Sequence, residues 1–205
     1  MLGAVLMGGR SRRMGRDKAL IELRGRPLWT YSAAAMLEAG VTEVLALAQP
    51  GQELGTMPTG VTRLNDSAPD GKEGPLVALN GALQLAQARG VSHLFVTPCD
   101  VPLVSARDIS WVCEALSSSG ADAAVLDCAP AGPHPLFGVY RVAEAARPAA
   151  EAVKAGHRAA KEILSRLEVC VVRLPEQRHA AVVAPCNTPT ELDHVAAKIS
   201  AREGC

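Results

Sequence analysis

A short loop near the start of the chain carries the residues best suited to chemistry. It opens with Gly8-Gly9, directly after the apolar run Gly3–Met7, and its basic side chains are Arg10, Arg12, Arg13, Arg16 and Lys18. An apolar run of this length predicts a buried parallel strand whose carboxyl end passes into the loop. Glycines let backbone N–H groups approach a ligand closely, and basic side chains neutralise its negative charge. The pattern therefore predicts a polyphosphate site.

The loop differs from the two most common phosphate-binding motifs. A Walker loop has four residues between its first glycine and a Gly-Lys-Ser/Thr triplet. Here five residues separate Gly9 from Gly15, and Arg16-Asp17 follows. The dinucleotide fingerprint G-x-G-x-x-G is also absent from this loop. The alternative is a basic surface loop or a nucleic-acid-binding arm, but a glycine pair directly after a buried strand is not typical of such charge runs.

Two carboxylates follow other predicted strands. Asp66 comes shortly after the strand expected at 61–64, and Asp100 comes after the strand expected at 93–97. Ligands of an open parallel sheet bind outside the carboxyl ends of its strands. Mg²⁺ bound to a triphosphate takes one or two carboxylates from the protein. We therefore expect Asp100 to hold Mg²⁺ and Asp66 to lie near the nucleoside, although an acid at a strand end can also be a simple turn residue.

The elements that position these residues alternate between strands and helices. After the first strand, we expect strands over residues 43–48, 61–64, 93–97 and 122–126. A helix from Pro27 to Ala39, one from Pro75 and one capped by Ser105 and Asp108 separate them. This alternation predicts an α/β fold, a single three-layer domain with a mostly parallel, Rossmann-like sheet and helices on both faces.

The second half of the chain is less regular. We expect strands over residues 136–140, 168–174 and 181–184, with one antiparallel strand in the sheet. The expected helices are 142–155, 158–167 and a last one that Thr188 caps with Pro189 first and Glu191 completing the capping box. We divide the single domain, residues 1–205, into a nucleotide-binding half (1–110) and an acceptor-binding half (111–205).

The composition excludes several function classes. The 21 basic and 21 acidic residues give a formal net charge of zero, which is unfavourable for general binding to nucleic acids or membrane surfaces. The six cysteines form no C-x-x-C pair, so a structural zinc site or a disulfide framework is not expected. The N-terminal residues do not have the pattern of a signal peptide, and no apolar stretch reaches membrane-spanning length. We therefore expect a cytoplasmic protein and, for its oligomeric state, a monomer.

The opening signature and several later segments resemble one family. The signature L-x-G-G-x-S-x-R-M-G-x-D-K runs from Leu6 to Lys18. The later segments are Gly74-Pro75-Leu76-Val77-Ala78, Cys99-Asp100-Val101-Pro102, His134-Pro135 and Asn187-Thr188-Pro189-Thr190-Glu191-Leu192. In these segments the chain resembles the molybdenum cofactor guanylyltransferases, which belong to the nucleotidyltransferase superfamily and have a nucleotide-diphospho-sugar transferase-like fold. The family usually has Ala where this chain has Met7, a bulkier residue near the expected position of the base.

This resemblance implies an activity and roles for particular residues. GMP would pass from GTP to the terminal phosphate of molybdopterin, or of molybdenum-molybdopterin, with release of pyrophosphate and with Mg²⁺ as cofactor. The residues implied in catalysis are Arg13, Lys18 and Asp100, with Asp100 as the metal ligand. Those implied in GTP binding are Leu6, Met7, Gly8, Gly9, Lys18, Asp66 and Asp100. For the acceptor we single out His134 and Asn187. Molybdenum cofactor insertion proteins and molybdoenzymes are the implied further partners.

Other functions remain open from the sequence. A CTP-dependent molybdopterin cytidylyltransferase is the nearest alternative, but such enzymes tend to have Ala-Gly where this chain has Gly8-Gly9. A related nucleotidyltransferase with another phosphorylated acceptor would keep the same fold. A nucleotide-binding module without catalysis has less need of both a triphosphate cation, Lys18, and a metal carboxylate, Asp100.

Overall fold

A mixed β-sheet forms the centre of the molecule. Within the described residues (1–7, 20–49, 51–65, 74–184, 186 and 188–203), the computed structural model has one sheet of seven strands in the order β5-β4-β1-β6-β8-β7-β9. The strands are β1 Leu2–Leu6, β4 Glu43–Ala48, β5 Val61–Asn65, β6 His93–Pro98, β7 Ala123–Asp127, β8 Pro133–Arg141 and β9 Val169–Val172. Among them, β8 alone runs antiparallel to its neighbours β6 and β7. This confirms the mostly parallel sheet with one antiparallel strand.

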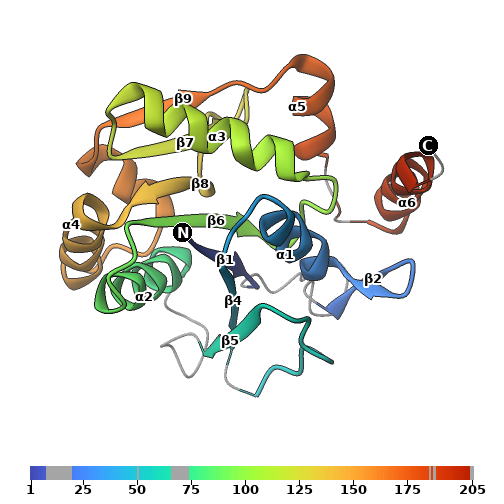
Figure 1. The fold of residues 1–205 in the computed structure, drawn as a ribbon, viewed down its shortest axis with the longest axis horizontal. Helices are drawn as coiled ribbons and strands as arrows, with labels where there is room; N and C mark the ends of the chain where they lie inside the picture. The colour runs from blue at the N-terminus through green and yellow to red at the C-terminus, as the bar shows by residue number, and fades with distance from the viewer. Residues whose placement is uncertain (8–19, 50, 66–73, 185, 187, 204–205) are drawn as a thin grey trace.

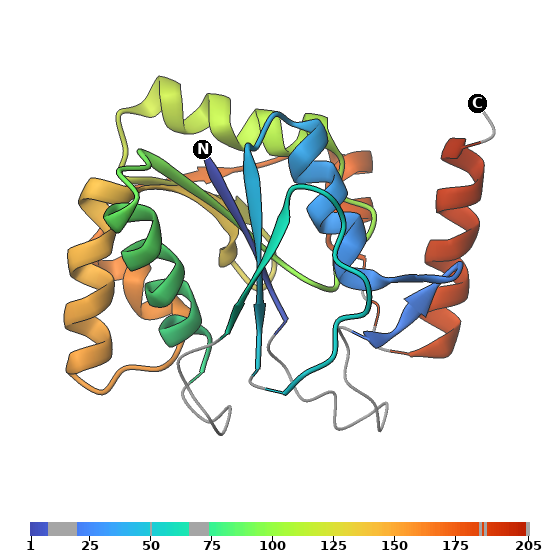
Figure 2. The ribbon, with the colours of Figure 1, turned by 60° about the horizontal axis from the view of Figure 1, so that its bottom comes forward.

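Helices cover both faces of this sheet, as Figures 1 and 2 show. The first face packs against α1 (Leu28–Glu38) and α3 (Ala106–Ser119), and the opposite face packs against α2 (Pro75–Ala88) and α4 (Val142–Lys154). Successive side chains of a strand point to opposite faces. Val5 of β1 accordingly lies in the α1–α3 core, and Leu6 lies in the α2–α4 core. The three-layer α/β prediction is confirmed.

Smaller elements complete the two halves. A short ribbon of β2 (Glu22–Leu23) and β3 (Arg26–Pro27) precedes α1, and a 3₁₀ helix, η2 (Ala160–Arg166), packs on the α2–α4 face. The last helix, α6 (Pro189–Glu203), lies beside the ribbon in Figure 2 and buries Val195 and Ile199 against Ile21 and Leu23. No helix in the described part of the chain is both long and apolar enough to cross a membrane.

Local capping follows the sequence closely. The Ser105 side chain accepts a hydrogen bond from the Asp108 N–H, and the Asp108 carboxylate accepts one from the Ser105 N–H at 2.9 Å. At α6, the Glu191 carboxylate likewise accepts from the Thr188 N–H at 3.0 Å. Both predicted capping boxes are therefore confirmed.

Gly74 occupies a position that suits glycine alone. Its φ is +83°, and an added Cβ would lie 2.8 Å from the carbonyl oxygen of Arg158. The same carbonyl accepts a hydrogen bond from the Leu76 N–H at 3.1 Å. The start of α2 is thereby joined to the segment that precedes η2.

Two predicted elements need correction. The segment 181–184 was expected as a strand, but it contains the end of helix α5 (Glu176–Val182). Pro175 precedes this helix, and its carbonyl accepts hydrogen bonds from the N–H groups of Arg178 and His179, both at 2.8 Å. A run of four apolar residues cannot distinguish a strand from a buried helix end. The helix expected at 158–167 is the shorter 3₁₀ helix η2.

Candidate active site

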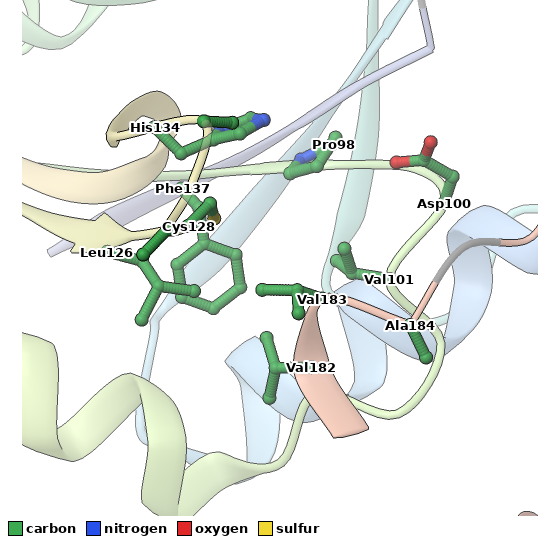
Figure 3. A pocket seen from close by; sticks show the side chains of 12 residues that line it. Pro98, Asp100, Val101, Leu126, Cys128, His134, Phe137, Val182, Val183 and Ala184 are labelled. Carbon is green, nitrogen blue, oxygen red and sulfur yellow. The ribbon is translucent and has the colours of Figure 1, made fainter. Parts of the chain in front are cut away.

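A pocket of about 380 Å³ lies at the carboxyl end of β6. This volume is within the range typical of small-molecule sites. Three segments line the pocket, as Figure 3 shows. They are the end of β6 with the residues after it (Pro98, Asp100, Val101), β7 and β8 with their connection (Leu126, Cys128, Ala129, Ala131, His134, Phe137), and the end of α5 with the residues after it (Val182, Val183, Ala184).

The antiparallel strand explains why distant polar residues meet in this pocket. Because β8 runs opposite to β6, its first residues lie at the edge of the sheet where β6 ends. His134 near the start of β8 and Asp100 after β6 therefore line the same pocket, although they lie 34 positions apart in the sequence. The structure thus brings together the predicted metal ligand and one predicted acceptor residue.

His134 lies in an unusual environment. Its Nδ1 atom is buried and has no hydrogen-bond partner among the described residues. Burial lowers the pKa of His134, and the negative charge of Asp100 opposes this shift with a smaller effect. A buried polar atom without a partner is costly in a folded protein. Because His134 lines the pocket, its neutral ring can present a polar group to a ligand there.

The end of β1 lies directly beside the Asp100 segment. The Cys99 N–H donates a hydrogen bond to the Leu6 carbonyl at 3.2 Å, and the Met7 N–H donates to the Leu47 carbonyl at 3.1 Å. The Met7 side chain is buried in the α1–α3 core. Its extra bulk compared with Ala is therefore absorbed by the core of the protein.

Several predicted site residues lie outside the described residues: Gly8, Gly9, Arg13, Lys18, Asp66 and Asn187. The strands that precede the first five of them are described. β1 and β5 run parallel to β4, and β1 also runs parallel to β6, so the ends of β1 and β5 share the sheet edge at which Asp100 lies. The roles of these residues stay predictions.

The described residues fit a metal that the substrate helps to hold. They include no group of three or more His, Cys, Asp or Glu side chains that could hold a metal ion. Mg²⁺, however, keeps water and phosphate oxygens and needs only one or two carboxylates. Asp100, at the edge where a triphosphate is expected, provides a ligand of this kind.

The described cysteines are free thiols. Burial, aided by the negative charge of Asp127, raises the pKa of Cys128 in the pocket wall. A thiol with a raised pKa is a poor nucleophile. The raised pKa of Cys128 therefore favours no covalent chemistry at this residue.

The sequence did not predict the apolar walls of the pocket. Leu126 and Phe137 were assigned only to strands, and Val182 and Val183 to a strand that is absent. The available signal was Pro175 followed by polar residues, which is typical of a helix start. With α5 recognised as a helix, its apolar end would have been a candidate pocket wall.

The fold is that of the nucleotidyltransferases. It is similar to the solved structure of molybdopterin-guanine dinucleotide biosynthesis protein A from Archaeoglobus fulgidus, with a TM-score of 0.75, 22% identity and coverage of 98% of this chain and 100% of that one. It is also similar to 2-C-methyl-D-erythritol 4-phosphate cytidylyltransferase from Thermus thermophilus, with a TM-score of 0.70, 20% identity and coverage of 97% and 98%. Residues 3–171 match the family model of the MobA-like NTP transferase domain, and the chain belongs to this family.

Relatives with closer sequences carry a more specific name. The chain is 31% identical over 200 residues to a probable molybdenum cofactor guanylyltransferase from Opitutus terrae, covering 94% of this chain and 93% of that protein. It is 39% identical over 104 residues to a molybdenum cofactor guanylyltransferase from Xanthomonas euvesicatoria, covering 51% of this chain and 49% of that protein. The family and the enzyme class predicted from the sequence are confirmed.

Proposed function

We propose that this enzyme transfers GMP from GTP to the terminal phosphate of molybdopterin, or of its molybdenum-loaded form, to give molybdopterin guanine dinucleotide. The observation that carries the proposal is the pocket in which Asp100 and His134 meet. This pocket lies at the sheet edge where β1 ends, shortly before Gly8-Gly9 in the sequence. The names of the relatives support the same substrates.

The reaction is a substitution at the α-phosphorus of GTP. An oxygen of the acceptor phosphate forms a bond to this phosphorus, the bond to the oxygen that bridges to the β-phosphorus breaks, and pyrophosphate leaves with that oxygen. Such transfers depend mainly on positioning and on neutralisation of charge. Mg²⁺ held by Asp100 would neutralise charge on the phosphates. Lys18 and Arg13 would stabilise the triphosphate and the leaving pyrophosphate.

The two halves of the domain would divide the substrates between them. Residues 1–110 would bind GTP through the segment Leu6–Gly9 and through Asp66 near the nucleoside. Residues 111–205 would bind the acceptor, with His134 offering a hydrogen bond inside the pocket and Asn187 a second polar contact. The neutral imidazole can donate or accept one hydrogen bond without bringing a charge close to the acceptor phosphate.

The decisive experiment is an assay of pyrophosphate release. The purified protein, Mg²⁺ and molybdopterin would be incubated in turn with GTP, CTP, ATP and UTP. We expect pyrophosphate and a guanine dinucleotide product with GTP. A preference for CTP would instead identify a cytidylyltransferase. Pyrophosphate release with a sugar phosphate in place of molybdopterin, but not with molybdopterin itself, would identify a different acceptor. Nucleotide binding without pyrophosphate release for any acceptor would contradict the enzymatic proposal.

The setting of the reaction follows from the same proposal. We place the enzyme in the cytoplasm as a monomer that passes its product to cofactor insertion proteins or molybdoenzymes. Sedimentation of the purified protein, with and without GTP, would test the monomer.

A further inference from the structure

The end of α5 forms one wall of the pocket beside Asp100. Val182, Val183 and Ala184 line this wall, facing Leu126 and Phe137 across the pocket (Figure 3). Val182 is 1% exposed and belongs to the α1–α3 core, so the wall is continuous with the interior of the protein. This part of the pocket is apolar, whereas the part near β6 and β8 carries the polar groups of Asp100 and His134.

A single arginine of α5 joins this helix to the segment that follows Asp100. Arg178 Nε donates to Asp108 Oδ1 at 3.0 Å, and Arg178 Nη2 pairs with Asp108 Oδ2. Arg178 Nη2 also lies 3.2 Å from the Leu103 carbonyl oxygen and 3.3 Å from Ser105 Oγ. All of these partners lie between residues 103 and 108. Arg178 therefore holds α5 against residues 103–108, which follow Asp100 in the chain.

The Arg178–Asp108 pair is built for geometric precision. Two guanidinium nitrogens contact both carboxylate oxygens, an arrangement that fixes orientation as well as distance. The Asp108 side chain is fully buried and that of Arg178 is 27% exposed, so solvent screens the pair weakly. Asp108 also caps α3. Loss of Arg178 would leave a buried carboxylate with its capping bonds alone.

A second pair from the same region provides a contrast. Arg173 Nε donates to Asp127 Oδ2 at 2.8 Å, but the Arg173 side chain is 82% exposed. Arg173 follows β9 and lines no part of the pocket. The two arginines lie five positions apart in the sequence. They differ mainly in the burial of the arginine side chain and in the number of bonds that it makes.

The wall lies beyond the residues that match the family model. The family match ends at residue 171, and α5 begins at Glu176. The matched part contains both Asp100 and His134. The polar residues of the pocket thus come from the segment that matches the model, and the wall comes from the residues that follow this segment.

We propose that α5 is the wall that selects the acceptor, and that Arg178 is the positioning residue that holds this wall in place. The apolar part of the pocket takes the ring-bearing part of the acceptor, and its phosphate lies toward Asp100 and His134. This inference rests on the proposed function, because it assigns the second substrate of that reaction to the pocket.

The first test compares Arg178→Met with Arg178→Lys and with the control Arg173→Met. Turnover would be measured while GTP and molybdopterin are varied separately. Arg178→Met should raise the KM for molybdopterin about tenfold while the KM for GTP stays within about twofold, because only the acceptor wall has moved. Arg178→Lys keeps the charge and should recover part of this loss. Arg173→Met should change either KM by less than about twofold, since Arg173 is exposed, lines no part of the pocket and does not contact α5 in its ion pair with Asp127.

The second test fills the pocket without touching the arginine. Val183→Phe adds a bulky ring at a half-buried position of the wall. We expect weaker molybdopterin binding in equilibrium dialysis and unchanged GTP binding. An equal loss for both ligands, or no loss in Arg178→Met and Val183→Phe alike, would overturn the assignment of α5 to the acceptor.

The same dialysis separates the two proposals. Wild-type protein that binds molybdopterin and GTP but releases no pyrophosphate would contradict the proposed function, while the variants would still decide the role of α5. Wild-type protein that fails to bind molybdopterin would overturn the assignment of the pocket. Circular dichroism of each variant would show that it has folded before its binding is interpreted.

Discussion

The two halves of the domain build their parts of the site in different ways. In residues 1–110, parallel strands end at one edge of the sheet, and each of β1, β5 and β6 leads directly into a segment with candidate polar residues. In residues 111–205, the antiparallel strand β8 brings His134 to this edge, and α5 supplies an apolar wall from beyond β9. The first half uses short motifs, whereas the second half uses tertiary packing.

This difference suggests a division of labour between chemistry and selection. Charge neutralisation at a triphosphate requires particular residue types at the ends of particular strands, so few substitutions can preserve it. An apolar wall requires shape, and many combinations of aliphatic side chains can provide a similar shape. Substitutions in the two halves should therefore affect different kinetic parameters.

The largest effect is expected in the nucleotide-binding half. Asp100→Ala and Lys18→Ala should each lower turnover by a hundredfold or more, equivalent to ~3 kcal/mol of transition-state stabilisation, because each removes a charge that the transferred phosphates need. Steady-state pyrophosphate release at saturating GTP would measure this loss. Glu114→Ala, at an exposed position of α3, is the control. Near-normal turnover in both variants would remove the proposed distinction between the halves.

The next effect concerns the stability of the acceptor wall. Arg178→Met should lower the free energy of unfolding by about 2 kcal/mol, because it leaves the buried Asp108 carboxylate without its ionic partner. Arg173→Met should cost less than this, because Arg173 is 82% exposed and makes one bond to Asp127, whereas Arg178 makes two bonds to Asp108 and is mostly buried. Urea unfolding of the two variants in parallel would measure the difference. Equal costs would indicate that burial does not distinguish the two pairs.

A third substitution tests where the halves touch. Gly74→Ala should cost about 2 kcal/mol, because the positive φ is strained for Ala and the added Cβ would collide with the Arg158 carbonyl. Gly90 has a φ of +65° and nothing within 4 Å of an added Cβ, so Gly90→Ala gives the cost of a positive φ without a steric contact. Gly90→Ala should therefore cost only about 1 kcal/mol. Thermal unfolding would compare the two variants.

The strands of residues 1–110 were predicted well from the sequence, for physical reasons. Buried strands that end in glycines or acids carry a local signal, so β1, β4, β5 and β6 were located within about one residue of their observed bounds. Capping boxes at Ser105 and Thr188 are equally local and were confirmed.

The wall of the pocket carried no comparable signal. Residues 181–184 are apolar because Val182 and Val183 pack against the α1–α3 core, and Ala181 and Ala184 pack against the cluster that contains Leu103. Such a run has the same composition in a strand and at a helix end. The Arg178–Asp108 pair joins positions 70 residues apart, which no pattern in a single sequence reveals. Asp108 was correctly predicted as a cap, but its second role depends on tertiary structure. The shared edge of Asp100 and His134 likewise followed only from the antiparallel direction of β8.

The smallest effect on stability is expected at His134, a residue of the pocket that both halves line. His134→Leu removes a buried ring nitrogen that lacks a partner among the described residues. The free energy of unfolding should therefore fall by no more than about 1 kcal/mol. The substitution should nevertheless raise the KM for molybdopterin about tenfold, because a hydrogen-bonding group in the pocket is lost. A fall in stability together with unchanged acceptor binding would assign His134 to the fold and not to the site.

The pH dependence of stability isolates the same side chain. Burial lowers the pKa of His134 below its ordinary value of 6.5 in the folded state, so the unfolded chain binds more protons in the window just below this value. The contribution of His134 is therefore fully present above pH 6.5 and is lost as the pH falls from 6.5 through the lower folded-state pKa. His134→Leu should flatten this part of the stability curve relative to wild type, which urea titrations between about pH 5 and pH 8 would measure. If the stability curves of wild type and His134→Leu were parallel over this pH range, the ring would not be desolvated in the folded protein. The pocket would then be more open to water than its walls indicate.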